Sequence, residues 1–508
     1  MREIMLDGNT LTFEAILAVA KDKKTVALSK PAVEKVIKCR NYVEKIISDG
    51  RVVYGLTTGF GKFSNISISP EHIDELQENL IMSHAMSVGK AYDIPQTRAI
   101  MLLRANVLAK GFSGIRLNTL QTLIDMLNKG VHPVILMQGS VGASGDLSPL
   151  SHLALVLIGK GKAEYQGEIM DGNKAMQKAC LKPVKLAAKE GLALNNGTQV
   201  MTGIGVLAYL EAQNLVQTAD IIAAMTIDAL KGTPRAFDPL VHKLRPHKGQ
   251  VNSAYNIRTV LLKSKLRESH INCDNVQDAY SLRCSPQVHG AVRDAMDYIK
   301  TTLEVEINSA TDNPLIFPDE DKVISGGNFH GEPLAIALDT MAIAMSEIAS
   351  ISERRIEQML NPALNRGLSP FLAARPGLDS GFMIAQLTAA SVVSENKVLA
   401  HPASVDSIPT SANQEDHVSM GSVSANKVLQ VIENVNTVLA IELMIAMQAL
   451  DLRDIPSSKA IETIKGELRK KVKHLAKDRI LYLEINYLKQ WLKDGHILDL
   501  VKDIVRLR

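Results

Sequence analysis

The chain has 508 residues, enough for a large core or for two to four compact regions. Its 57 lysines and arginines nearly balance 54 aspartates and glutamates, and apart from a cluster at 469–473 they are spread along the chain, which argues against nucleic-acid binding. Four cysteines without a CxxC pair exclude a disulfide framework and indicate a reducing compartment; they are Cys39, Cys180, Cys273 and Cys284.

The first residues, MREIMLDGNTLTFEAI, place Asp and Asn where a signal peptide needs an unbroken apolar segment. No later run approaches the roughly 18 to 20 apolar residues that span a bilayer. We therefore expect a soluble, cytoplasmic protein with no membrane partner.

Residues 1–200 form the first predicted region. Short apolar runs alternate there with turn signals, such as Asp49-Gly50 and the glycines at 59, 61, 111 and 114. This texture predicts a smaller, mixed N-terminal region with irregular loops.

Residues 201–508 are predicted to form a bundle of long helices. Four stretches keep apolar residues at helical spacing and are rich in small and unbranched side chains: 203–230, 332–360, 381–400 and 424–450. Such helices bury more than one face, which favours subunit association. The segment after Ile455, including the single Trp491, is predicted to form peripheral helices.

The loop GSVGASGDLSPL at 139–150 fits none of three common motifs. A P-loop needs Lys after its last glycine, but Asp146 follows Gly145. The glycines at 139, 142 and 145 are three apart throughout, unlike G-x-G-x-x-G, and GASG lacks a residue of the hydrolase motif G-x-S-x-G. A phosphate loop and a serine hydrolase are therefore not indicated.

Ala143, Ser144 and Gly145 have minimal side chains, which permit the Gly145 nitrogen to attack the Ala143 carbonyl carbon and close a five-membered ring. Loss of water, including the Ser144 hydroxyl, then gives an alkene conjugated to a ring carbonyl. The alternative from these residues alone is a small-residue turn before a helix, capped by Asp146 or Ser148 with Pro149 at the first helical position.

Seven segments, in order, resemble the histidine ammonia-lyase family, which belongs to the aromatic amino acid ammonia-lyases and aminomutases. They are YGLTTGFG at 54–61, SHA at 83–85, GSVGASGDLSPLSH at 139–152, GLALNNGT at 191–198, QDAYSLRC at 277–284, GNFHG at 327–331 and SANQEDH at 411–417. The resemblance extends over nearly the whole chain.

The resemblance implies a methylidene-imidazolone (MIO) group formed autocatalytically from Ala143, Ser144 and Gly145, with no external cofactor. An electrophilic alkene accepts the substrate amine and makes it a better leaving group. The implied reaction is the first step of histidine degradation, from L-histidine to trans-urocanate and ammonia. A homotetramer whose active sites each collect residues from three subunits is also implied.

The resemblance assigns catalytic roles outside the tripeptide. Tyr54 matches the family's mobile tyrosine and is assigned β-proton abstraction, while Tyr280 matches a tyrosine that assists proton transfer at the amine; the two roles are interchangeable on sequence alone. Arg283 suits bidentate capture of the substrate carboxylate and shares a face with Tyr280 if the segment is helical. Asn196 matches an asparagine near the carboxylate and the electrophile.

Substrate contacts are assigned in the same way. Gln277 and Phe329 match residues that hydrogen-bond to the substrate and line the pocket, and Asp146 assists ring closure or orients the turn. A site for an imidazole needs a polar partner for each of the two ring nitrogens, and His84 and Glu415 are the two expected partners. They favour histidine over the alternative, a phenylalanine or tyrosine ammonia-lyase or aminomutase.

Three positions depart from the family pattern: Thr57 replaces a common asparagine, Ala279 a proline, and Asn195 an apolar residue. Thr57 makes its loop closer to that of the relatives with aromatic substrates. The thirteen histidines form no H-E-x-x-H motif, so we expect no metal requirement.

Overall fold

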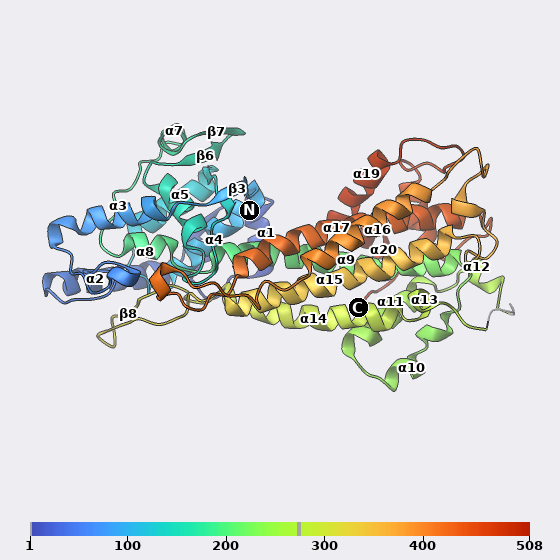
Figure 1. Ribbon diagram of the computed structural model, residues 1–508, viewed down its shortest axis with the longest axis horizontal. Coiled ribbons are helices and arrows are strands. Elements are labelled where there is room, and N and C mark those ends of the chain that lie inside the picture. The colour runs from blue at the N-terminus through green and yellow to red at the C-terminus, as the bar shows by residue number, and fades with distance from the viewer. Residues whose placement is uncertain (1–2, 272–275) are drawn as a thin grey trace. The chain divides into compact units, whose positions relative to one another are not determined.

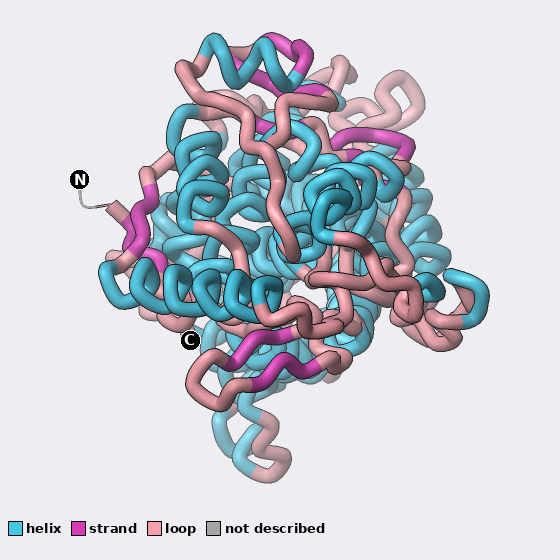
Figure 2. The backbone as a smooth tube through the Cα atoms, turned by 90° about the vertical axis from the view of Figure 1, so that its left-hand side faces the viewer, coloured by secondary structure: helices cyan, strands magenta, loops and turns pink. Residues whose placement is uncertain are grey.

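The computed structural model describes residues 3–271 and 276–508, so Cys273 lies outside the described residues. The fold is 58% helical with few short strands, which confirms the mainly α prediction. Figure 2 shows the strands as short paired segments among the helices.

Two compact units, each discontinuous in sequence, make up the chain (Figure 1). Unit 1 comprises residues 1–207, 300–339 and 402–426, and unit 2 comprises 208–299, 340–401 and 427–508. The predicted boundary at residue 200 lies near the first division, but the chain later returns to unit 1 twice. These returns bring in Phe329 and Glu415, which a single cut would place in the helical bundle.

Unit 1 combines helices with four small sheets. Its helices are α1 (Phe13–Ala20), α2 (Lys30–Ser48), α3 (Ile73–His84), α4 (Ile94–Ala109), α5 (Leu117–Lys129), α6 (Leu147–Leu157), α7 (Gly172–Lys178) and α8 (Glu190–Asn195). Its strands are β1 (Ile4–Leu6), β2 (Val26–Leu28), β3 (Val88–Ala91), β4 (His132–Pro133), β5 (Leu136–Gln138), β6 (Lys162–Tyr165), β7 (Glu168–Asp171), β8 (Leu315–Phe317) and β9 (Lys322–Ile324).

The strands form local pairs and one three-stranded sheet. β1 pairs with β2 in parallel, while β3–β5, β8–β9 and β4–β6–β7 are antiparallel. The central helix is α4, in which every residue from Thr97 to Ala109 is buried. A capping box between Asp93 and Gln96 fixes its start by satisfying otherwise unpaired backbone N–H groups.

Unit 2 is built from helices. Those confined to it are α10 (Pro239–Lys243), α11 (Lys248–Val260), α12 (Lys265–Glu268), α13 (Tyr280–Arg283), α16 (Met383–Leu399), α18 (Lys459–Leu468), α19 (Tyr482–Lys493) and α20 (His496–Val501). Four long helices contribute residues to both units: α9 (Gln199–Ala229), α14 (Ser285–Glu306), α15 (Glu332–Leu360) and α17 (Gly421–Asp451). The four helices predicted from apolar spacing correspond to α9, α15, α16 and α17.

The prediction that no apolar run is long enough to span a membrane was wrong for two helices. By length and composition α15 and α17 are apolar enough to cross a bilayer, but 61% and 78% of their most apolar windows are buried inside the protein. Burial on this scale is typical of core helices, which are hydrophobic on several faces.

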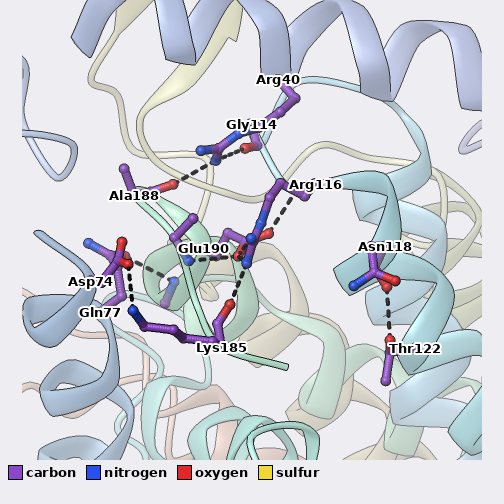
Figure 3. A network of polar contacts seen from close by, with 12 residues as sticks. Arg40, Asp74, Gln77, Gly114, Arg116, Asn118, Thr122, Lys185, Ala188 and Glu190 are labelled. Carbon is purple, nitrogen blue, oxygen red and sulfur yellow. Dashed lines mark hydrogen bonds and ion pairs between the residues drawn. The ribbon is translucent and has the colours of Figure 1, made fainter. Parts of the chain in front are cut away.

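An ion pair between the half-buried Arg116 and the buried Glu190 holds the short helix α8 (Figure 3). Helix α8 leads into Asn196. The fully buried Glu190 accepts hydrogen bonds from the backbone N–H and the guanidinium of Arg116 and from the backbone N–H of Ala187. Gln77 of α3 accepts one from the Gly191 N–H at 3.0 Å. Helix α3 ends at His84, and α8 is followed by Asn196. These contacts therefore fix the two helices that position His84 and Asn196.

Candidate active site

The tripeptide loop is a tight, mostly buried turn. Ala143 and Gly145 are buried and Ser144 is half-buried. Gly142 and Gly145 have φ of +66° and +70°, a region that side chains with a Cβ rarely adopt. A Cβ on Gly145 would also lie 2.2 Å from the Gly197 carbonyl oxygen. Glycine is therefore required at position 145 for both backbone conformation and space.

Three other segments hold this loop through backbone hydrogen bonds. Asp146 N–H donates to the Gly197 carbonyl at 2.7 Å, and Gly145 and Gly197 form a parallel bridge. Gly331 N–H donates to the Gly142 carbonyl at 3.1 Å, and Met420 N–H donates to the Val141 carbonyl at 2.8 Å. The family-like segments around 197, 331 and 420 thus converge on the tripeptide.

Asp146 occupies the N-cap position of α6, but its side chain does not cap that helix. One carboxylate oxygen instead accepts from the Val200 and Met201 N–H groups, at 3.0 and 2.9 Å, at the start of α9. The other accepts from Ser422 Oγ at 2.9 Å. Burial raises the pKa of Asp146 to about 6, although these donors oppose the shift. The side chain therefore joins the tripeptide loop to the N-termini of α9 and α17.

Asn196 contacts the tripeptide directly. Its Nδ2 donates to the Ser144 carbonyl oxygen at 3.0 Å, while its buried Oδ1 has no hydrogen-bond partner among the described residues. The fully buried Arg104 donates to the Asn196 carbonyl oxygen at 2.9 Å and to that of Ala193. Arg104 thereby fixes the C-terminal end of α8, although no sequence motif marks it as a site residue.

Glu415 meets the tripeptide from the 410–417 loop. Its Oε1 accepts from Ser144 Oγ at 2.7 Å. Its Oε2 accepts from the hydroxyls of Thr410 and Ser411, at 2.6 and 2.9 Å. These three hydroxyls orient the carboxylate toward the tripeptide. From the sequence alone, Glu415 was equally compatible with a solvated turn.

His84 is the last residue of α3. Its Nδ1 lies 3.0 Å from Ser83 Oγ. Burial lowers the pKa of His84, while a hydrogen bond to the Leu80 backbone and the negative charge of Glu415 act in the opposite direction. The imidazole is therefore favoured in its neutral form, which both donates and accepts hydrogen bonds.

Tyr54 begins the glycine-rich loop predicted to carry catalysis. The Gly61 N–H donates to its phenolic oxygen at 3.2 Å. Thr57 braces the same loop internally, because its hydroxyl accepts from the Val53 N–H at 3.0 Å and donates to the Arg51 carbonyl at 3.1 Å.

Two adjoining cavities in unit 1 contain these side chains. They have volumes of about 720 and 510 Å³ and share Tyr54, Ser144, Asn196 and Glu415 in their linings. The larger is mainly apolar and adds His84 with Phe60, Phe63, Ile66, Leu80 and Leu147. The smaller is more polar and adds Ala143, Phe329, His330, Asp416 and His417. An amino acid with a ring and charged groups has suitable surroundings on both sides of Ser144.

Unit 2 holds the remaining predicted site residues as a cluster of their own. Tyr280 and Arg283 lie in α13, with the guanidinium carbon 4.5 Å from the tyrosine ring centroid, so they share a face as their spacing predicted. With its amide oxygen turned toward Arg283, Gln277 accepts from both terminal guanidinium nitrogens at 3.0 Å. Tyr280 is 71% exposed.

A family model described as aromatic amino acid lyase matches residues 11–470. The chain belongs to the aromatic amino acid lyase family. The family recognition based on the seven segments is thereby confirmed.

Relatives of this lyase include a histidine ammonia-lyase from Caldanaerobacter subterraneus subsp. tengcongensis, 55% identical over 506 residues and covering 99% of each chain. The crystal structure of histidine ammonia-lyase from Trypanosoma cruzi is 43% identical, with a TM-score of 0.92, covering 99% of this chain and 96% of that one. A tyrosine aminomutase from Streptomyces globisporus is 36% identical, with a TM-score of 0.94 and full coverage of both chains.

The three departures from the pattern of this lyase family have local explanations. Thr57 bonds within its own loop and lines neither cavity. Ala279 has a φ of −60°, the value that proline would impose, so the backbone keeps the same conformation. Asn195 is fully buried and donates to Ser151 Oγ at 3.1 Å, while its Oδ1 has no partner in the described part of the chain.

His330 and His417 have no site role predicted from the sequence. Both line the more polar cavity, and their rings stack with centroids 5.8 Å apart. His330 Nδ1 accepts from the Glu332 N–H at 3.3 Å, so Nε2 carries the proton toward the His417 carbonyl oxygen at 3.2 Å. The neighbouring family motifs GNFHG and SANQEDH were the available signal. Among the described residues, no group of three or more His, Cys, Asp or Glu side chains has metal-binding geometry.

Proposed function

We propose that this lyase removes ammonia from L-histidine to give trans-urocanate, the first step of histidine degradation, as a cytoplasmic enzyme. The main support for this proposal is that His84 and Glu415 line the same cavity as Ser144 and interact electrostatically. Two polar side chains suit the two ring nitrogens of an imidazole, which a benzene ring lacks. Relatives named histidine ammonia-lyase at 51–55% identity support the same substrate.

The residues around the tripeptide fit an MIO group made from Ala143, Ser144 and Gly145. Gly145 is pressed against Gly197 without room for a Cβ, and Gly142 likewise faces Ser419. Asn196 Nδ2 donates to the carbonyl of Ser144, which cyclisation would make the ring carbonyl. These features leave space for a compact ring and supply a donor where its carbonyl would lie.

Once formed, this group supplies an electrophilic alkene for the substrate amine. Asn196 polarises it by holding the Ser144 carbonyl oxygen, and its unpartnered Oδ1 remains available for a donor on the substrate. His84 and Glu415 hold the imidazole and orient the β-carbon. Phe329 lines the polar side of the site.

Proton removal from the β-carbon is assigned to Tyr54, with Tyr280 assisting proton transfer at the amine; the reverse assignment is the alternative. Tyr54 is favoured for the base because it lines both cavities beside Ser144. The Gly61 N–H that donates to its oxygen fixes the position of the phenol in the site.

Carboxylate capture is assigned to Arg283, which Gln277 and Tyr280 orient. Its planar guanidinium matches a carboxylate in bidentate fashion. We infer a homotetramer in which each active site takes these three residues from a subunit other than the one supplying Ser144.

Ultraviolet absorbance with histidine, phenylalanine and tyrosine as separate substrates tests the proposal, because each product is a conjugated acid. We expect an absorbance gain with histidine, and its absence would refute the proposal. The alternative is a phenylalanine or tyrosine ammonia-lyase or aminomutase. Similarity to a tyrosine aminomutase structure favours it. An absorbance gain only with phenylalanine or tyrosine would support an ammonia-lyase for that substrate, whereas an aminomutase would give a β-amino acid, which has no conjugated alkene and is detected by chromatography.

A further inference from the structure

Glu415 contacts the one hydroxyl that maturation of the tripeptide would remove. Its Oε1 lies 2.7 Å from Ser144 Oγ, within the range over which a carboxyl group transfers a proton. Thr410 and Ser411 donate to the other oxygen, so Oε1 is the oxygen directed at Ser144.

The neighbouring acid, Asp146, is occupied elsewhere. Its two carboxylate oxygens accept hydrogen bonds from Val200, Met201 and Ser422, and the residue is fully buried. Glu415 instead lines both cavities, which gives its carboxyl group a path for exchanging protons with solvent.

We propose that Glu415 is a catalytic residue for maturation, in addition to its role with the imidazole: it is the general acid that protonates the departing hydroxyl of Ser144. The inference rests on the proposed function, because it assumes that the tripeptide forms an MIO group.

The step is the dehydration of Ser144. The Cα–H bond breaks, its proton passes to a solvent water, and its electron pair becomes the second bond of the Cα=Cβ alkene. Glu415 first takes up a proton from solvent at Oε1, so that Oε1 donates to Ser144 Oγ instead of accepting from it. The Cβ–Oγ bond then breaks with its pair on oxygen, and the oxygen takes this proton. One water departs, and Glu415 returns to its carboxylate form.

Protonation matters because hydroxide is a poor leaving group, and a positioned general acid contributes about 10²–10⁴-fold to such a step. Glu415→Gln retains the size and hydrogen-bonding capacity of the side chain but has no acidic proton. The substitution therefore separates proton donation from simple orientation.

Intact mass of the full-length protein, followed over time after expression, tests the proposal without an activity readout. Complete maturation removes two waters, about 36 Da. For Glu415→Gln we expect this deficit to appear about 100-fold more slowly, with a species lacking only one water accumulating. Asn79→Ala is the matched control: Asn79 lines the same cavity but takes no part in the hydrogen bonds of Glu415 with Ser144, Thr410 and Ser411, so this variant should mature at the wild-type rate.

Thr410→Val provides a second variant, because it removes one hydroxyl that directs Oε1 at Ser144; we expect maturation about tenfold slower. Full mass deficits at the wild-type rate in both variants would overturn the inference while leaving the proposed function intact. A wild-type protein with no mass deficit would instead refute the MIO group itself.

Discussion

Asn196 Nδ2 donates a hydrogen bond to the carbonyl oxygen of Ser144 across 3.0 Å, although 52 residues separate the two in sequence. Asn196 follows α8, whose position depends on buried contacts from Arg104, Arg116 and Gln77. The donor aimed at the tripeptide is therefore fixed before reaction, the condition under which dipoles stabilise developing charge most effectively.

Replacing Asn196 by alanine should lower kcat for histidine about 100-fold. Removing one preorganised donor at a site of developing negative charge costs about 10²–10³ in kcat. Steady-state kinetics at saturating histidine measures this effect.

Asn195→Leu is the adjacent control for that experiment. Asn195 bonds to Ser151 and not to the tripeptide, and leucine removes a buried oxygen that has no partner among the described residues. We expect kcat within about twofold of wild type, because no contact with Ser144 is lost. Equal losses in the two variants would mean that disruption of α8, rather than the Asn196 donor, explains the result.

The stability of the protein should carry a pH signature from Asp146. Its pKa of about 6 when folded lies above the ordinary 3.8, so the folded state binds more protons between these values. The contribution of Asp146 to the free energy of unfolding is thus fully present below pH 3.8 and is lost as the pH rises through about 6.

Asp146→Asn removes this titration while nearly preserving shape. Its free energy of unfolding, relative to wild type, should increase by about 2 kcal/mol between about pH 4.5 and pH 7. Urea unfolding at the two pH values measures this difference. A constant or decreasing difference would contradict the raised pKa.

Substrate preference should depend on His84 and not on Thr57. For His84→Leu we expect kcat/KM for histidine to fall about 100-fold, because a buried polar partner of the imidazole is lost. Thr57→Asn should change the ratio of histidine to tyrosine turnover less than about threefold, since in the described structure the Thr57 hydroxyl bonds to the backbone of Val53 and Arg51 and lines neither cavity. A larger change for Thr57→Asn would show that this loop selects the substrate.

The proposed sharing of active sites between subunits predicts complementation. Tyr54→Phe and Arg283→Ala should each be inactive alone, but co-expressed subunits should recover about a quarter of wild-type activity, since random assembly gives about one site in four both intact residues. Purification through two different affinity tags isolates the mixed oligomers. Mixed oligomers with no activity above that of the separate variants would place both residues of each site in one subunit.

Several features followed from the sequence because their physical cause is local. Apolar residues at helical spacing located α9, α15, α16 and α17, since one buried stripe needs only the helical period. The tripeptide was assigned as an MIO precursor from the resemblance of the seven segments to the family, because its own residues are equally compatible with a small-residue turn before a helix. The spacing of Tyr280 and Arg283 placed them on one face of a helix before the structure did.

Other features depended on tertiary structure because they join segments far apart in the chain. Helical spacing gives no indication that residues 300–339 and 402–426 return to unit 1, bringing Phe329 and Glu415 to the cavities that contain Ser144. The sequence also did not indicate that Asp146 caps the start of α9 rather than its own helix α6. Which helix is capped depends on the unpaired N–H groups that the fold brings near the buried carboxylate. The sequence by itself determined the long helices and the candidate tripeptide. Tertiary structure decided which donors and acids face the tripeptide, since hydrogen bonds depend on distances in space rather than along the chain.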